Sequence, residues 1–286
     1  MNFAAAADYA ERHALEAMLV VSDGDALFER YAPGFDAAKP HALYSGAKSF
    51  WGVAAVAAAE DGLLALDEPV GHTFKEWSTG MRARVTLREL LQLTSGIGFG
   101  GLGNAVPTYA KALAVEPREE PGETFTYGGI PLQVFGAVFA AKLAAGGRAP
   151  HVYLRERILD PVGCKVASWR TLADGTHPLP TGAFLSARDW SAYGRFIASG
   201  GLVGGNQLVS AAGLASCFTG SAANPRYGLG WWLSPIPREF PDLVYASGAG
   251  GQAMYVVPSR NLVIVKFSKS ASFAHATFLR RLASRV

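Results

Sequence analysis

Hydrophobic and polar positions alternate differently at the two ends of this chain and in its middle. Near the amino end, apolar residues recur at helical spacing over residues 5–17 and predict an amphipathic helix. The apolar run 18–21 and the segment Ala26-Leu27-Phe28-Glu29-Arg30-Tyr31 then flank the turn Ser22-Asp23-Gly24-Asp25, which predicts a β-hairpin.

The carboxyl end repeats this arrangement in the opposite order. Residues 253–257 and 262–267 are apolar runs separated by Pro258-Ser259-Arg260-Asn261, and they predict a second hairpin. A helical pattern over about 273–284 follows. We therefore expect strands and a helix at each end of the chain.

The middle of the chain has mainly helical patterns, separated by loops rich in Gly and Pro. The economical arrangement joins the terminal strands in one antiparallel sheet flanked by the terminal helices, with the helical middle as a second lobe. We predict an α/β (α+β) fold in a single domain over residues 1–286. Its α/β lobe would comprise about 1–66 and 175–286, and its inserted, mainly helical lobe about 67–174.

Composition narrows the range of partners. Half of the residues are hydrophobic, which is enough to bury a sizeable core, while 17% are charged and the net charge is +3. A phosphate backbone usually requires a concentrated basic surface, so we expect no nucleic-acid partner. A small-molecule substrate is the expected partner, and the oligomeric state stays open.

We expect a cytoplasmic protein with no membrane association. The first residues have no basic segment and reach Asp8 and Glu11 before a long apolar stretch can develop, so no secretory signal is predicted. The most apolar run, residues 130–145, contains Pro131 and Lys142 and is too short to span a bilayer.

The residues that could hold a metal are scattered. Cys164 and Cys217 form no C-x-x-C pair, and the six histidines include neither H-E-x-x-H nor a close pair. His41, four residues before Ser45, fits an exposed loop residue better than a residue of the site. We expect no metal, no disulfide and no cofactor.

The strongest chemical signal is Ser45 followed at a spacing of three by Lys48. Both come just before an Ala-rich helical segment that ends at Gly62, so Ser45 is expected at or near a helix start. The spacing places Lys48 on the same face one turn later. Unpaired N–H groups at a helix start favour an alkoxide and the oxyanion of a tetrahedral intermediate.

Lysine acts as a base only when neutral, so this site must lower the Lys48 pKa from about 10.4 towards neutrality by desolvation. A Ser-x-x-Lys pattern arises by chance roughly once in a chain of this size, so alone it is a weak signal. Here Ser45 begins the only such pattern in the sequence.

Several stretches extend the match over most of the chain. They are LYSGAKSF at 43–50, DGLLALDEPV at 61–70, TLRELLQLTSGI at 86–97 and PGETFTY at 121–127. Together they resemble the β-lactamase-like, penicillin-recognising serine hydrolases, in particular class C β-lactamases and family VIII esterases. The resemblance implies a β-lactamase/transpeptidase-like fold and makes Tyr127 the expected proton shuttle between nucleophile, lysine and leaving group.

A third family motif corresponds to Tyr245-Ala246-Ser247-Gly248-Ala249. Relatives place a strand here opposite the nucleophile, and this version is similar to members that act on esters and short amides, including the 6-aminohexanoate-dimer hydrolase group. The resemblance implies an oxyanion hole from the backbone N–H groups of Ser45 and Gly248, or Ala249 if the register shifts by one. It makes Ser247 and Ala249 candidates for contact with substrate.

Two departures concern the substrate. Tyr127 is followed by Gly128-Gly129, where class C enzymes have an amide-bearing asparagine at the second position, and the third motif lacks a cationic lysine or histidine. We therefore expect an acyl-enzyme at Ser45 that forms from small carboxylic esters or short amides. The alternatives are a β-lactamase or D,D-peptidase, and a non-catalytic penicillin-binding-like domain that captures ligands.

Overall fold

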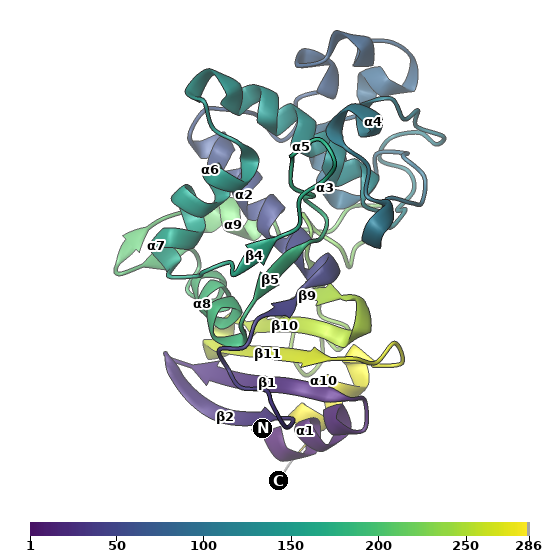
Figure 1. The fold of residues 1–286 in the computed structure, drawn as a ribbon. Helices are drawn as coiled ribbons and strands as arrows, with labels where there is room; N and C mark the ends of the chain where they lie inside the picture. Colours follow the sequence, from purple (N-terminus) through teal and green to yellow (C-terminus); the bar gives the residue numbers. More distant parts are fainter. Residues whose placement is uncertain (285–286) are drawn as a thin grey trace.

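The computed structural model describes residues 1–284 and has a mixed sheet-and-helix fold (Figure 1). Six antiparallel strands form the main sheet in the order β2-β1-β11-β10-β9-β8. The strands are β1 (Leu15–Ser22), β2 (Asp25–Tyr31), β8 (Trp232–Leu233), β9 (Val244–Gly248), β10 (Gln252–Val257) and β11 (Leu262–Ser268).

Both predicted hairpins are confirmed as β1–β2 and β10–β11, and the two ends of the chain meet in one sheet because β1 pairs with β11. The predicted helix over 5–17 is wrong at its carboxyl end. Helix α1 (Phe3–Glu11) stops early because Ala14 takes a left-handed conformation, with φ of 54°, and β1 begins at the next residue.

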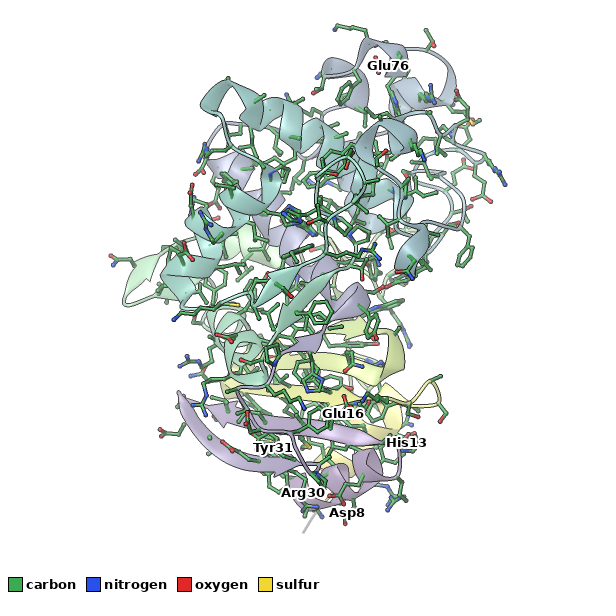
Figure 2. The ribbon with its side chains drawn as sticks, in the orientation of Figure 1. Asp8, His13, Glu16, Arg30, Tyr31 and Glu76 are labelled. Atoms are coloured by element: carbon green, nitrogen blue, oxygen red, sulfur yellow. The ribbon has the colours of Figure 1, made fainter. Side chains whose placement is uncertain are left out.

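The two terminal helices cover one face of the sheet. Helix α10 (His275–Ala283) packs beside α1, and the Asn2 N–H donates to the Leu282 carbonyl at 2.8 Å. Arg30 on β2 lies 3.8 Å from Asp8 on α1 at the surface (Figure 2). Helix α8 (Ala187–Ala198) covers the opposite face, where Gly194 lets Val263 and Met254 approach closely.

The remaining elements lie mainly above the sheet in Figure 1. The helices are α2 (Lys48–Glu60), α3 (Leu87–Gln92), α4 (Tyr109–Leu113), α5 (Ile130–Leu143), α6 (Pro150–Leu154), α7 (Asp160–Val162) and α9 (Ala211–Ser216), and a π-helical turn (Arg155–Leu159) joins α6 to α7. Two small sheets comprise β3 (His41–Ala42), β4 (Ser168–Trp169) and β5 (Ala183–Leu185), and β6 (Leu202–Val203) with β7 (Asn206–Gln207).

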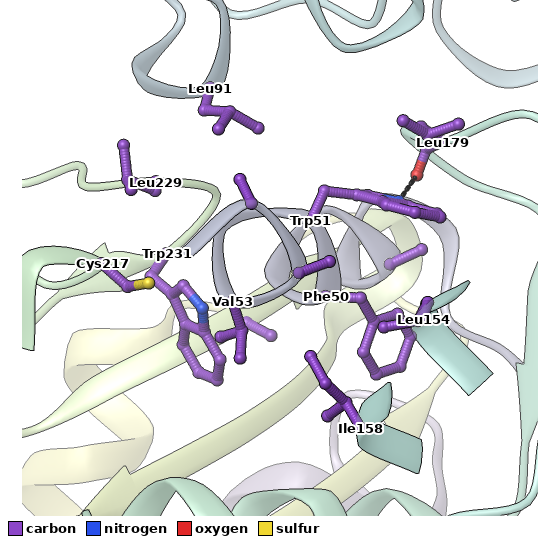
Figure 3. Close-up of a cluster of buried hydrophobic side chains, with 14 of the residues drawn as sticks. Phe50, Trp51, Val53, Leu91, Leu154, Ile158, Leu179, Cys217, Leu229 and Trp231 are labelled. Carbon is purple, nitrogen blue, oxygen red and sulfur yellow. Dashed lines mark hydrogen bonds between the residues drawn. The ribbon is translucent and has the colours of Figure 1, made fainter. Parts of the chain in front are cut away.

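Helix α2 lies in the centre of the core and is buried on all sides over most of its length (Figure 3). Phe50 and Val53 pack among apolar side chains, and the Trp51 indole N–H donates to the Leu179 carbonyl at 2.6 Å. At Gly52 a Cβ would lie 2.1 Å from the Leu229 carbonyl oxygen, so only glycine fits there. These contacts fix the axis of the helix that begins at Lys48.

One continuous core joins the elements on both sides of the predicted lobe boundaries. Leu19 of β1 and Phe139 of α5 belong to the same buried cluster. The division at about residues 67 and 174 therefore stays a prediction. Within residues 1–284 no single helix is long and apolar enough to cross a bilayer. One pair of helical segments, Ile130–Gly146 and Pro150–Val162, has the length and composition of a membrane span when taken together, but the two segments are bent by 78° relative to each other.

Candidate active site

Ser45 lies in a short 3₁₀ turn, Tyr44–Ala47, that leads directly into α2. The turn follows β3, and Tyr44 takes a left-handed conformation with φ of 48°, which is unfavourable for a bulky residue. The chain thereby reverses sharply, and the Ser45 side chain lines a cleft while Gly46 and Ala47 are buried behind it.

Lys48 is the partner of Ser45. Its Nζ lies 2.9 Å from Ser45 Oγ and 3.4 Å from the Pro180 carbonyl oxygen, and the side chain is 1% exposed. Within residues 1–284 no carboxylate forms an ion pair with it, so burial acts unopposed and lowers its pKa to about 7. A substantial fraction of this amine is therefore neutral at physiological pH.

Tyr127 completes the group from the loop that precedes α5. Its hydroxyl is hydrogen-bonded to Ser45, and its ring centre lies 4.8 Å from Lys48 Nζ. Burial raises the Tyr127 pKa, and the hydrogen bond to Ser45 opposes part of that rise. The ring stacks on Trp232 at 5.8 Å, which restricts its orientation. Tyr127, far from the other two residues in sequence, thus meets Ser45 and Lys48 in the folded chain.

Gly129 shows why the asparagine of relatives is missing after Tyr127. A Cβ at this position would lie 1.9 Å from the Gly101 carbonyl oxygen, and the Gly129 N–H donates to the Gly100 carbonyl at 2.9 Å. The glycine-rich stretch 96–101, which is a loop, fills the space that an amide side chain would need.

The cleft at Ser45 has a volume of about 440 Å³. Ser247 and Gly248 of β9 line it, together with Ala249 in the following turn. Gly248 packs directly on the turn of the nucleophile, since a Cβ there would lie 2.0 Å from the Leu43 carbonyl oxygen. Both predicted alternatives for the second oxyanion donor therefore lie at the cleft.

Two further lining residues, Tyr44 and Tyr245, belong to the first and third motifs. The others could not be identified from sequence and are Leu102, Gly103, Thr181, Trp232 and His275. These five come from separate loops, from β8 and from the start of α10, and only the tertiary fold brings them together. Within residues 1–284 no lysine or arginine is among the lining residues, and burial lowers the His275 pKa to about 4, so this side chain is neutral at pH 7.

The prediction that His41 is an exposed loop residue is wrong. It is buried rather than exposed, with Nδ1 3.2 Å from Glu16 Oε2 and its ring stacked on Phe267. It contacts the core of the sheet and does not line the cleft.

A larger cavity, of about 810 Å³, lies between α6 and β4, and none of Ser45, Lys48 and Tyr127 lines it.

The chain matches one protein family over nearly its whole length and is similar to several solved structures. The Beta-lactamase family model matches residues 6–284. No curated protein sequence matches. Among solved structures, a candidate 6-aminohexanoate-dimer hydrolase from Bacillus anthracis is 19% identical, with 97% of this chain and 81% of the other covered and a TM-score of 0.81.

Two further structures are similar over almost their whole length. A class C beta lactamase from Rhodobacter sphaeroides is 16% identical, with 97% of each chain covered and a TM-score of 0.72. A family VIII carboxylesterase is 15% identical, with 99% of this chain and 96% of the other covered and a TM-score of 0.74. The expected β-lactamase/transpeptidase-like fold is confirmed.

Proposed function

This chain belongs to the beta-lactamase family of hydrolases, and we propose that it cleaves small carboxylic esters or short amides through an acyl-enzyme at Ser45. The observation that carries the proposal is the 2.9 Å contact between Ser45 Oγ and a buried Lys48 amine that has no anionic partner within residues 1–284. Burial makes this amine a base that is available near neutral pH.

Acylation follows from this geometry. The neutral Lys48 amine takes the Ser45 proton while Oγ forms a bond to the substrate carbonyl carbon. The resulting oxyanion would accept hydrogen bonds from the backbone N–H groups of Ser45 and of Gly248 or Ala249. When the tetrahedral intermediate collapses, Tyr127 gives its proton to the leaving oxygen or nitrogen and regains one from the Lys48 ammonium group.

Deacylation repeats these steps with water as the nucleophile. Water loses a proton to the base, its oxygen bonds to the acyl carbon, and the bond to Ser45 Oγ breaks as Oγ is reprotonated. The carboxylic acid is released and the site returns to its starting state. None of these steps requires a group other than those of the chain and water.

The lining of the cleft favours uncharged substrates. The carboxylate of a bicyclic β-lactam needs a cation or strong donors in a partly desolvated cleft, because an unpaired buried charge is costly. The lining residues within 1–284 include no lysine or arginine, and Gly129 has no room for an amide. The similarity to a family VIII carboxylesterase supports ester substrates.

The test compares kcat/KM for p-nitrophenyl butyrate and for nitrocefin on one preparation, with Ser45→Ala as background. We expect the ester to be cleaved far faster, and a fluorophosphonate probe to attach to Ser45 alone. Nitrocefin turnover equal to the ester's would favour the β-lactamase or D,D-peptidase alternative. Adduct formation undiminished in Ser45→Ala would refute the nucleophile, and an inert wild-type protein would favour the non-catalytic ligand-binding alternative.

We infer a small-molecule substrate as the partner, since the composition predicts no concentrated basic surface. We also propose a cytoplasmic location, which the free, buried thiols of Cys164 and Cys217 fit. Cell fractionation tests the location directly. Recovery of the protein in the membrane or periplasmic fraction would contradict it.

A further inference from the structure

A short chain of polar groups runs from the cleft into the core behind β9. Ser247 lines the cleft, and its Oγ lies 3.0 Å from Nε2 of His275, the first residue of α10. The other ring nitrogen of His275, Nδ1, lies 2.6 Å from the hydroxyl of Tyr255 on β10. The acyl-transfer steps above use none of these three side chains, so the arrangement calls for a separate explanation.

His275 is neutral at pH 7. Burial lowers its pKa to about 4, and the nearby Lys266 acts in the same direction. Aromatic rings surround it, with the Tyr245 and Phe273 ring centres at 5.1 and 5.4 Å. A neutral imidazole carries one N–H, so one ring nitrogen donates a hydrogen bond and the other accepts one.

Tyr255 decides which nitrogen carries the proton. Burial keeps its hydroxyl protonated by raising its pKa well above the usual value, and its ring stacks on Phe278 and Tyr245. If His275 Nδ1 were the donor, the Tyr255 O–H would have to turn away into apolar surroundings. Leaving a buried donor without an acceptor is unfavourable. The O–H therefore donates to Nδ1, and the proton of the imidazole is on Nε2.

This tautomer fixes the role of Ser247. The His275 Nε2–H donates to Ser247 Oγ, which leaves the Ser247 O–H to donate elsewhere, and the cleft is the space it faces. We propose that Tyr255 and His275 hold the Ser247 hydroxyl as a hydrogen-bond donor to substrate, which makes the cleft selective for acyl groups bearing a second, uncharged acceptor oxygen.

The proposal rests on the ester-hydrolase function above and narrows its substrate class. A neutral ether or ketone oxygen suits a single uncharged donor. A carboxylate at the same place would need a cation that the cleft lining within residues 1–284 does not provide. His275 and Tyr255 are positioning residues in this scheme, and Ser247 is the residue that contacts substrate.

Matched esters test the selectivity. One pair is p-nitrophenyl pentanoate and p-nitrophenyl 3-methoxypropanoate, and the other is p-nitrophenyl butyrate and p-nitrophenyl methoxyacetate, where an oxygen replaces one methylene. The ratio of kcat/KM, oxygenated over alkyl, should fall about three- to tenfold in Ser247→Ala for at least one pair. Comparing this ratio between the variant and the wild type cancels the difference in intrinsic reactivity between the two esters.

Two variants serve as controls for this ratio. Thr181→Val removes another hydroxyl from the cleft lining and should leave the ratio unchanged. His275→Gln keeps an amide N–H that can point at Ser247 and should restore most of the ratio that His275→Ala loses. A ratio that is the same in Ser247→Ala and wild type, or that falls equally in Thr181→Val, would overturn the proposal.

The tautomer is tested without any turnover. In protein labelled with ¹⁵N-histidine, the His275 signals, identified by their loss in His275→Gln, should show a protonated Nε2 and an unprotonated Nδ1 at pH 7. Tyr255→Phe should abolish this strong preference. A protonated Nδ1 in the wild type would overturn the proposal even if esters are cleaved, whereas failure of Ser45 labelling would instead refute the hydrolase function.

Discussion

At the scale of single residues, Lys48 shows how burial can change the chemistry of a side chain. Lysine is normally a cation in water, yet here its amine is enclosed by protein and contacts a serine hydroxyl and a backbone carbonyl. Neither contact supplies a negative charge, so burial stabilises the neutral amine relative to the ammonium form. Because Lys48 lies three residues after Ser45, the neutral amine is placed to accept the proton of the serine hydroxyl.

The first prediction is that acylation depends on pH with an apparent pKa near 7. The free amine is the active form, so the rate should rise as pH increases through the lowered Lys48 pKa of about 7 and level off above it. Stopped-flow measurement of fluorophosphonate or p-nitrophenyl ester burst rates gives this profile. Because Tyr127 contacts the same hydroxyl, the measured value belongs to the coupled pair.

Lys48→Met should lower the acylation rate by a factor on the order of 10²–10⁴, the usual contribution of a general base. Lys111→Met, at an exposed position outside the cleft, is the matched control and should leave the rate unchanged. A near wild-type rate in Lys48→Met would rule out the general-base role.

Ser45, Lys48 and Tyr127 could be predicted from the sequence because each belongs to a local motif. His275 and Thr181 could not, since no spacing relates the start of α10 or a loop before β5 to a serine far away in the chain. The prediction of an exposed His41 was wrong for a related reason. The buried Glu16 and Phe267 that surround His41 come from β1 and β11, which meet only in the folded sheet.

At the scale of elements, the contact between the 96–101 loop and the start of α5 limits what can follow Tyr127. Gly129 lies against the Gly101 carbonyl with no space for a side chain. An asparagine at position 129 would therefore require the 96–101 loop to move.

The second prediction follows from this packing. Gly129→Asn should destabilise the protein by about 1–3 kcal/mol, the usual cost of overpacking, and should not create nitrocefin turnover. Urea unfolding and the nitrocefin assay measure the two effects. Gly98→Ala, where a Cβ would meet only the Arg118 side chain at 3.7 Å, is the control and should change stability little. A stable Gly129→Asn variant that cleaves nitrocefin would contradict this account.

Strong periodic patterns predicted the long strands of the sheet, while short elements escaped prediction. β3 and β4 contain two residues each, and a pattern of period two cannot be recognised in so short a segment. The helix over 5–17 was extended too far because alanines continue a helical pattern past Glu11, and nothing in the sequence signals the left-handed turn at Ala14.

At the scale of the whole molecule, two buried lysines affect stability. Lys266 on β11 is fully buried, donates to Ser268 Oγ at 2.7 Å and lies over the Phe273 ring. Burial lowers its pKa to about 7, as it does for Lys48. Below this pH both the folded and the unfolded chain are protonated, so the folded state bears the full cost of two buried charges.

The third prediction is that the free energy of unfolding rises between about pH 7 and pH 9. Over this window the unfolded chain keeps its lysine protons, whereas the folded chain has released them, so unfolding takes up protons and stability increases with pH. The gain should be about 2 kcal/mol per pH unit for the two groups together near pH 8. It should shrink towards pH 9, where the unfolded chain loses thiol protons that the buried Cys164 and Cys217 keep. Urea unfolding across this range measures it.

Lys266→Met should raise stability at neutral pH and halve the lysine contribution to this slope, because of the two buried lysines only Lys48 would then contribute. The exposed Lys111→Met should leave the slope unchanged. A stability curve that is flat or falling from pH 7 to pH 9 would contradict the assignment of both groups.

Because β1 pairs with β11, the main sheet cannot be completed until the last strand has been synthesised. The ribosome releases residues 15–22 long before residues 262–268, yet β1 lies between β2 and β11 in the sheet. Until the last strand emerges, the early hairpin has one open edge rich in apolar residues, which favours aggregation. Nascent chains halted before residue 262 should therefore depend on chaperones far more than the finished protein does.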